Sequence, residues 1–456
     1  MLSRQLLRNQ LTASSRLVST SLSFTRLASG GGKKTSFSRK SVSSGSKNRA
    51  PKKINGASIY SFKHTAPYSK FNLNAPELSE ELGGTKVLDL SAEKAELFNN
   101  SSVYKFSENA SKSLTIFGSF KPTQRHELFK DHATLIRKDT SAALFDVIEG
   151  GISGSSNSNR ICITGAKGVG KSSALAQAQA FAVEKGYVVI PVSRAFDLLS
   201  GRFDTAANKK NKASKIFLQP MYVKKLLKTI ASGNKEVLKT IKISKNYTFG
   251  DASTRSELKF NAGESTLYDL IKRSNKEGHA EDVYIFNAFI DELSTQTSAP
   301  VLFTLDELNI FSYQPFALNR DFDNNPIYHG DLQVPNTFLQ FLSGERSFQK
   351  GAVIGSLAGA YGFSETLQVG LGQKAEPKAY AKKSEYDEVL ASKLKGVKSI
   401  EVSHLTYEET ASLLEYYKNG QVFSDELNEQ FIQQKYFLSG NGNAQALIKS
   451  VTEVYY

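Results

Sequence analysis

The sequence predicts an α/β fold in which a parallel sheet is flanked by helices, with a helical C-terminal part and a basic N-terminal arm. Three observations support this prediction. A short apolar strand runs into a glycine-rich loop and a helix over residues 160–180. A second apolar strand at 187–192 completes the strand–helix–strand unit of a parallel sheet. A third strand, at 301–305, is buried in character and is followed by two acidic residues.

The N-terminal arm differs in charge from the rest of the chain. The 456 residues include 58 Lys and Arg against 44 Asp and Glu, and the first acidic residue is Glu77. Fourteen basic residues precede it, so residues 77–456 carry no net charge. Residues 1–30 are rich in Arg and Ser, a composition that predicts a mitochondrial transit peptide. A basic tail without a targeting role is the alternative.

Residues 31–110 are predicted to form a basic, extended arm. Between Lys33 and Lys70, Lys and Arg alternate with Ser, Gly and Asn, and the apolar content is low for independent folding. Such segments suit nucleic acids, because Lys and Arg neutralise phosphates and aromatic side chains stack on bases. A solvated tail is an equally good interpretation.

Composition excludes several classes of protein. The single cysteine, Cys162, excludes an internal disulfide and a cysteine-based zinc site. The longest weakly polar run, Gly351–Phe363, is short of the roughly 20 residues that span a bilayer, so we expect no membrane span. The six histidines form no cluster, and no metalloprotease or Ser/His/Asp signature is present.

The glycine-rich loop fits the phosphate-binding pattern G-x-x-x-x-G-K-[ST] at every position, with the strand and helix that the pattern requires. Glycines let backbone N–H groups face phosphate oxygens, and the helix start adds positive partial charge. Lys171 is expected to reach the β- and γ-phosphates, and Ser172 to bind Mg²⁺. A turn that binds nothing is the alternative. The candidate nucleotide-binding residues are Gly165, Ala166, Lys167, Gly168, Val169, Gly170, Lys171, Ser172 and Ser173.

The acidic strand end at Asp306-Glu307 matches the Walker B pattern that accompanies such a loop. Asp306 is expected to hold Mg²⁺ opposite Ser172. Glu307 stands where an ATPase keeps the base for the attacking water, and it is the candidate catalytic residue. A surface carboxylate after a strand is the alternative for Glu307.

A further apolar strand, 352–357, contains Ser356, a candidate polar contact to the γ-phosphate. A small residue selected for close packing is the alternative. No Asn-Lys-x-Asp motif is present, so guanine and adenine both remain open. Arg320 and Arg346 lie between the later strands, but neither is assigned as an arginine finger.

The predicted nucleotide-binding domain, 111–395, contains a basic insert at about 200–280. Residues 209–245 hold 11 lysines and one acidic residue, and their centre has a helical pattern. This predicts a polyanion partner, with a solvated helix face as the alternative. Residues 396–456 are predicted to form a helical lid, starting with the capping box Thr406-x-x-Glu409.

These parts together resemble an AAA+-type P-loop protein. The motifs that carry this resemblance are the glycine loop, the late Asp-Glu-Leu-Asn strand end, Ser356, and the tail from Val402 to Glu409. The start of the last helix, at 442–445, lacks the arginine that many relatives have, which argues against vigorous hydrolysis.

More narrowly, the chain resembles the death-associated-protein family of the mitochondrial small ribosomal subunit, in a fungal form. The resemblance covers about 110–456, with Phe117-Gly118-Ser119, His126–Phe129, Leu135-Ile136-Arg137 and Gln219-Pro220 as carrying residues. It implies a seat in the head of the subunit, with contacts to small-subunit rRNA, neighbouring ribosomal proteins and the large subunit through an intersubunit bridge. It also implies a bound guanine nucleotide, GTP or GDP, with Mg²⁺ and weak or absent turnover, although ATP remains possible.

Two other functions explain part of the sequence. A free AAA+-like ATPase or GTPase of the mitochondrial matrix accounts for Glu307 and for an intact Lys171-Ser172. An NTPase stimulated by nucleic acid accounts for the lysine-rich insert. The interpretation that explains most features is a structural component of the mitochondrial ribosome that binds a nucleotide.

Overall fold

The computed structural model describes residues 86–88, 98, 101–129, 131–208, 214–250, 258–273, 279–377 and 386–452. The chain divides into two compact units after Ser61, and all described residues belong to the second unit. The predicted transit peptide and most of the predicted arm lie outside the described residues.

The central sheet has five parallel strands in the order β13-β3-β12-β9-β4. Two strands from late in the chain therefore separate the strand before the glycine loop from the strand after the following helix. This order is that of the AAA+-like P-loop class predicted from the sequence. The strands are β3 (Arg160–Thr164), β4 (Val188–Val192), β9 (Val301–Asp306), β12 (Gly351–Ser356) and β13 (Lys398–Glu401).

The four strands with apolar sequences are buried on both faces, because successive side chains point to opposite sides of the sheet. In β3, Ile161 and Ile163 contact one hydrophobic cluster and Cys162 contacts the other. In β9, Leu302 belongs to the same cluster as Ile161, and Phe303 belongs to the same cluster as Cys162. The sheet therefore needs a layer of helices on each side.

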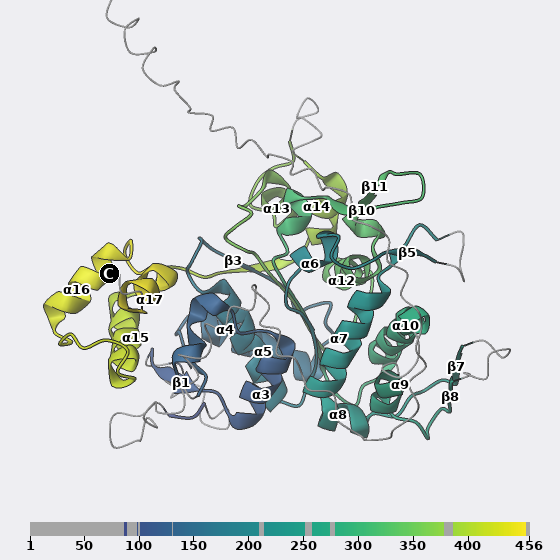
Figure 1. Ribbon diagram of the computed structural model, residues 1–456, viewed down its shortest axis with the longest axis horizontal. Coiled ribbons are helices and arrows are strands. Elements are labelled where there is room, and N and C mark those ends of the chain that lie inside the picture. The colour runs from purple at the N-terminus through teal and green to yellow at the C-terminus, as the bar shows by residue number, and fades with distance from the viewer. Residues whose placement is uncertain are drawn as a thin grey trace, which may run out of the picture. The chain divides into compact units, whose positions relative to one another are not determined.

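Helices supply both layers (Figure 1). One layer contains α3 (Glu108–Phe117), α4 (Thr140–Ser153) and α5 (Lys171–Glu184). The other contains α7 (Pro220–Gly233), α10 (His279–Thr295) and α12 (Gln333–Ser343). The result is a three-layer α/β/α core.

The basic insert is helical, as predicted, but it breaks at Asn234 between α7 and α8 (Lys235–Thr240). The Asn234 side chain accepts a hydrogen bond from Val189 N at 2.7 Å and donates to Val189 O at 2.9 Å. Val189 lies on β4, the edge strand of the sheet. The break therefore allows an amide side chain to satisfy backbone groups that an edge strand leaves unpaired.

Short elements decorate this core. The hairpin formed by β10 (Phe316–Arg320) and β11 (Pro326–Tyr328) was not predicted from the sequence. The additional strands are β1 (Val103–Lys105), β2 (Ala133–Leu135), β5 (Ala206–Ala207), β6 (Phe217–Leu218), β7 (Tyr247–Phe249), β8 (Leu258–Phe260), β10 (Phe316–Arg320) and β11 (Pro326–Tyr328). The additional helices are α6 (Phe196–Leu199), α9 (Leu267–Arg273), α11 (Ile310–Tyr313), α13 (Glu365–Gly370), α14 (Glu388–Leu394) and the 3₁₀ turns Pro122–Gln124, His126–Leu128 and His329–Asp331.

The C-terminal helices form a group of their own, yellow in Figure 1: α15 (Tyr407–Asn419), α16 (Glu429–Leu438) and α17 (Ala444–Thr452). The predicted capping box begins α15, since Thr406 and Glu409 exchange side chain-to-backbone hydrogen bonds. A separate hydrophobic cluster holds the three helices together and includes Phe129 from the segment before the sheet.

Candidate functional site

The glycine loop joins β3 to α5 and wraps around the start of that helix. Gly165, Gly168 and Gly170 all have positive φ angles, of 133°, 83° and 106°. A side chain at Gly165 would clash with the carbonyl oxygen of Val402, and one at Gly168 with the side chain of Asn443. Glycine is therefore required here both by backbone conformation and by close packing. The loop leaves the N-terminus of α5 positioned to bind an anion.

Lys171 lies in the first turn of α5 and folds back over the loop. Its Nζ donates hydrogen bonds to the carbonyl oxygens of Gly165, at 2.8 Å, and Ala166, at 2.5 Å. Burial lowers the pKa of Lys171, whereas the nearby Asp306 carboxylate raises it. A phosphate group would offer this ammonium an anionic partner in place of two neutral carbonyls.

Ser172 and Asp306, 134 residues apart in sequence, are in contact: Ser172 Oγ donates to Asp306 Oδ2 at 3.0 Å. Asp306 is the last residue of β9 and is almost fully buried. A hydroxyl and a carboxylate side by side form part of the hard oxygen ligand set that Mg²⁺ prefers. The two residues predicted to bind magnesium therefore fit that ion chemically.

Ser356 ends β12 directly opposite Asp306 in the register of the sheet. Its hydroxyl is buried, and among the described residues it has no hydrogen-bond partner. The structure thus brings three polar side chains to the carboxyl edge of the sheet: Asp306 and Ser356 at the ends of two strands, and Ser172 in the first turn of α5. Parallel sheets collect their functional residues at this edge.

Glu307 follows Asp306 with an unusual backbone conformation, φ 69°, which is uncommon outside glycine. Its carboxylate lies 3.5 Å from Arg194 Nε and accepts a hydrogen bond from Phe196 N at 3.4 Å. Burial raises the pKa of Glu307, and the Asp306 charge raises it further, while Lys121 and Arg194 act in the opposite direction. The carboxylate is therefore oriented by the segment after β4.

Sequence reasoning missed Lys121, Gln124 and Arg194, which all contact predicted site residues. Lys121 Nζ lies 3.2 Å from Asp306 Oδ2, and Gln124 Nε2 donates to Ser173 Oγ at 2.8 Å. Lys121 and Gln124 lie between the two family motifs quoted above, Phe117–Ser119 and His126–Phe129. That proximity was the only available signal, because neither residue belongs to the loop or strand patterns.

Arg320 and Arg346, the two arginines between the later strands, do not lie at the acidic strand end. Arg346 precedes β12, at the opposite edge of the sheet, and pairs with Asp291 at 2.7 Å. Arg320 ends β10 and donates to Asn324 O at 3.0 Å within the hairpin. Arg194 is the arginine that the structure brings to the acidic strand end.

Two pockets adjoin the glycine loop. One, of about 380 Å³, is lined by loop residues and by the segment after β12, including Gly359. The other, of about 110 Å³, lies between α5, the segment before the sheet and the C-terminal helices. Its lining is mostly apolar and includes Phe120, His126, Phe129, Val169, Ser173, Leu405, Tyr417 and Ala444.

The C-terminal helices close directly on the loop. Asn443 Nδ2 donates to Lys167 O at 2.7 Å, and Gln445 N donates to Gly168 O at 2.9 Å. These contacts come from the helix start where the sequence lacks the expected arginine. An uncharged amide therefore contacts the loop at this point.

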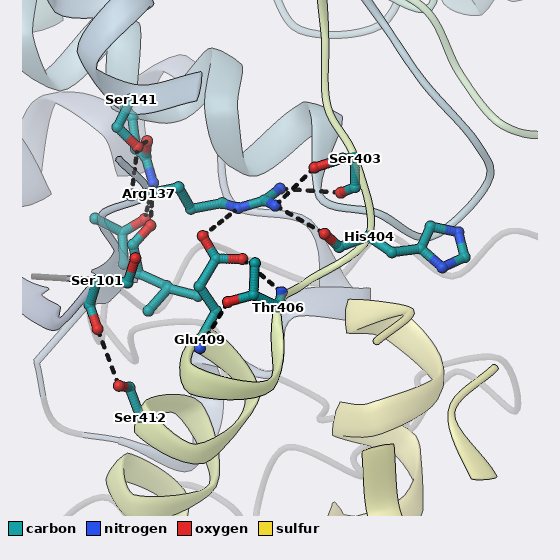
Figure 2. Close-up of polar contacts among 11 residues, drawn as sticks. Ser101, Arg137, Ser141, Ser403, His404, Thr406, Glu409 and Ser412 are labelled. Atoms are coloured by element: carbon teal, nitrogen blue, oxygen red, sulfur yellow. Dashed lines mark hydrogen bonds and ion pairs between the residues drawn. The ribbon is translucent and has the colours of Figure 1, made fainter. Parts of the chain in front are cut away.

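Arg137 ties the C-terminal helices to the core (Figure 2). Its Nε donates to Glu409 Oε1 at 3.1 Å, and its Nη atoms donate to the carbonyl oxygens of Ser403 and His404 at 3.0 and 2.9 Å. Both charged side chains are nearly buried, at 11% and 6% exposure. The linker before α15 and the first turn of α15 are thus held by one guanidinium.

A lysine-bearing surface lies away from this site. The buried side of α7 packs into the core through residues such as Val223 and Leu227. Exposed lysines on α7, on α8 and in the segment between α8 and β7 form what we call the lysine face: Lys225, Lys228, Lys235, Lys239, Lys242 and Lys245.

Other site types find no support in the described part of the chain. No group of three or more His, Cys, Asp or Glu side chains is arranged to hold a metal ion there. Within the same residues, no helix is long and apolar enough to cross a membrane. Burial raises the pKa of the Cys162 thiol to about 12, which suits a packing role.

The sheet order, the glycine loop and the acidic strand end define an AAA+-like P-loop protein. A family model described as mitochondrial ribosomal death-associated protein 3 matches residues 134–450. The chain belongs to the mitochondrial ribosomal death-associated protein 3 family. The protein is accordingly a mitochondrial ribosomal protein, which agrees with the localisation predicted from the sequence.

Two fungal relatives are called small ribosomal subunit protein mS29. The relative from Neurospora crassa is 27% identical over 359 residues, which are 75% of this chain and 73% of that protein. The relative from Schizosaccharomyces pombe is 24% identical over 361 residues, which are 77% of this chain and 71% of that protein. A solved Walker-type ATPase of Pyrococcus abyssi covers 68% of this chain and 65% of its own, with 15% identity and a TM-score of 0.35. At that similarity it adds nothing to the fold assignment.

Proposed function

We propose that this protein is a structural component of the small subunit of the mitochondrial ribosome, in its head region, and that it holds a purine nucleotide with Mg²⁺ at the glycine loop. The observation that carries the nucleotide proposal is the contact of Ser172 Oγ with Asp306 Oδ2 at 3.0 Å beside a complete phosphate loop. GTP or GDP is favoured because of the family resemblance, and ATP is the alternative.

Each group of the site would bind a different part of the nucleotide or its metal. Backbone N–H groups from Gly168 to Ser173 would cradle the phosphates, and Lys171 would supply a positive charge. Ser172 and Asp306 would hold Mg²⁺, which would neutralise phosphate oxygens when bound. The apolar pocket beside Val169 offers a place for the flat base, between α5 and the C-terminal helices.

We propose that the nucleotide is held rather than turned over. The Glu307 carboxylate is engaged by Arg194 and by the backbone of Phe196. At the start of α17 the loop is contacted by Asn443 instead of a charged side chain that would stabilise transition-state charge. The nucleotide would then act as a structural part that joins the core to the C-terminal helices.

The lysine face is the proposed contact for small-subunit rRNA. The lysines of this face on α7 and α8 stand on helices that pack into the core through residues such as Leu227 and Leu238, so these charges are held on a rigid surface. A phosphate backbone is the polyanion expected in a ribosome, and lysines bind it without regard to sequence. Further proposed partners are neighbouring ribosomal proteins and the large subunit, which the chain would contact through an intersubunit bridge.

The test is the nucleotide content of small subunits purified from mitochondria at moderately high salt. We expect this chain to remain with the subunit, and one guanine nucleotide per copy to be released on denaturation. Purified subunits that contain the chain but no nucleotide would contradict the nucleotide proposal. A chain that sediments free of the subunit would favour the matrix ATPase or GTPase.

A further inference from the structure

The segment 118–124 lies across the start of α5, and we call it the strap. Ser119 Oγ donates to Gln179 Oε1 at 2.5 Å, near the middle of α5. Gln124 Nε2 donates to Ser173 Oγ at 2.8 Å in its first turn. Gln124 Oε1 accepts from Lys121 N at 2.8 Å, so the same side chain also fixes the backbone of Lys121. The strap is thus fastened to the helix that follows the glycine loop.

The strap directs Lys121 at the proposed magnesium position. Lys121 Nζ donates to Ser193 O at 2.6 Å and lies 3.2 Å from Asp306 Oδ2. Ser172 Oγ donates to that same carboxylate oxygen. The Asp306 side chain is only 4% exposed, and a buried carboxylate requires a compensating charge. Lys121 supplies it, with its own side chain 22% exposed.

We propose that Lys121 is a built-in cation of the nucleotide site. It adds positive charge beside Asp306 and a bound diphosphate, as Mg²⁺ would, so that nucleotide is retained without the metal. This inference rests on the proposed function, that the glycine loop holds a nucleotide. An ammonium and a magnesium ion that share one carboxylate repel each other. Lys121 therefore lowers the affinity of the site for Mg²⁺, and its own positive charge remains when the metal is absent. A site of this kind suits a nucleotide that stays in place through assembly and translation.

The experiment compares nucleotide affinity with and without the metal. The full-length chain is freed of nucleotide and titrated with methylanthraniloyl-GDP, and separately with methylanthraniloyl-ADP, in excess Mg²⁺ and in excess EDTA. The quantity measured is the ratio of the dissociation constants in EDTA and in Mg²⁺. We expect a ratio below about 5 for the wild type, and above about 50 for Lys121→Met, because Asp306 then lacks the ammonium that lies 3.2 Å from its Oδ2.

Two further variants sharpen the result. Lys121→Arg keeps the charge and should keep a ratio close to that of the wild type. Lys112→Met removes a lysine of the preceding helix that pairs with Glu108 at the surface, and it should leave the ratio unchanged. Melting curves without nucleotide show whether each variant is folded.

Three results would overturn the inference. A wild-type ratio above about 50 would do so even if Lys121→Met failed to fold. Equal ratios for the wild type and folded Lys121→Met would do so as well. A wild-type chain that binds neither nucleotide in either buffer would overturn the proposed nucleotide binding itself, and the inference with it.

Discussion

Glu409 accepts the Nε hydrogen of Arg137 at 3.1 Å through Oε1, while its Oε2 accepts from Thr406 N at 2.9 Å. The carboxylate that completes the capping box of α15 is therefore also the partner of the buried guanidinium from the core (Figure 2). The Glu409 side chain therefore takes part both in the local cap of α15 and in an ion pair with Arg137, which is 272 residues away in sequence. The start of the C-terminal helical domain cannot move without breaking both.

Replacing Glu409 by Ala should therefore destabilise the chain strongly. The substitution leaves the guanidinium of Arg137 buried without its carboxylate and removes half of the capping box. We expect a loss of about 3–5 kcal/mol in the free energy of unfolding, measured by urea titration. Lys112→Ala, which breaks an exposed ion pair on α3, serves as the control and should leave the unfolding midpoint unchanged. Equal effects of the two substitutions would contradict this assignment.

Lys171→Ala should abolish nucleotide binding at ordinary concentrations. It removes the ammonium that faces the phosphates, and we expect the dissociation constant of GDP to rise about 100-fold, or about 2.7 kcal/mol. The control is Lys112→Ala, an exposed lysine of α3 outside the loop, with a change below about 3-fold. If the nucleotide is structural, Lys171→Ala should also lower the yield of assembled small subunits in mitochondria. Normal assembly with an empty site would show that the nucleotide has no structural role.

Glu307→Gln tests whether hydrolysis matters. The substitution removes the proposed base and keeps the size of the side chain. We expect nearly normal growth on a respiratory carbon source, with nucleotide still bound to the subunit. A severe growth defect with the site still filled would point to hydrolysis as the function of this residue.

The stability of the chain should fall in weak acid because of His126 and His132. Burial lowers the pKa of His126 to about 3, and it also lowers the pKa of His132. Below pH 6.5 the unfolded chain therefore binds protons that the folded chain does not. The stability contribution of His126 is complete above pH 6.5 and is lost as the pH falls toward 3, and that of His132 is lost in the same direction.

For His126 the slope approaches about 1.4 kcal/mol per pH unit within that window. His126→Gln should flatten the dependence by about that amount. Urea titrations of both proteins between pH 7.5 and pH 5 measure it. Parallel pH curves for the two proteins would be the contradictory outcome.

The lysine face should determine how strongly RNA binding depends on salt. Replacing Lys228, Lys235 and Lys242 together by Ala should weaken the binding of small-subunit rRNA fragments, and by a similar factor whatever the sequence of the fragment. The slope of log affinity against log salt should become shallower by about 2, since roughly 0.7–0.9 is expected per phosphate contact. The control replaces the exposed Lys395, Lys398 and Lys449, which lie outside α7, α8 and the segment after them. The same loss of slope for both triple variants would exclude a dedicated face.

The fold could be predicted from sequence wherever one short pattern has one physical solution. The glycine loop and the helix after it are local: their residues are neighbours in the chain, and their chemistry permits few conformations. The capping box of α15 is local in the same way. The break of the basic helix at Asn234 was not predictable, because its cause is the backbone of Val189 on a strand 45 residues earlier.

The sequence by itself determined the class of the protein, the residues of the glycine loop, the acidic strand end and the family, because each of these is written in contiguous residues. Only the tertiary structure brought Lys121 to Asp306, Arg194 to Glu307 and Arg137 to Glu409. Lysines and arginines are common throughout the chain, and no spacing rule distinguishes the few that become buried partners. That choice is made by packing, since a carboxylate excluded from water is stable only where the fold delivers a cation to it.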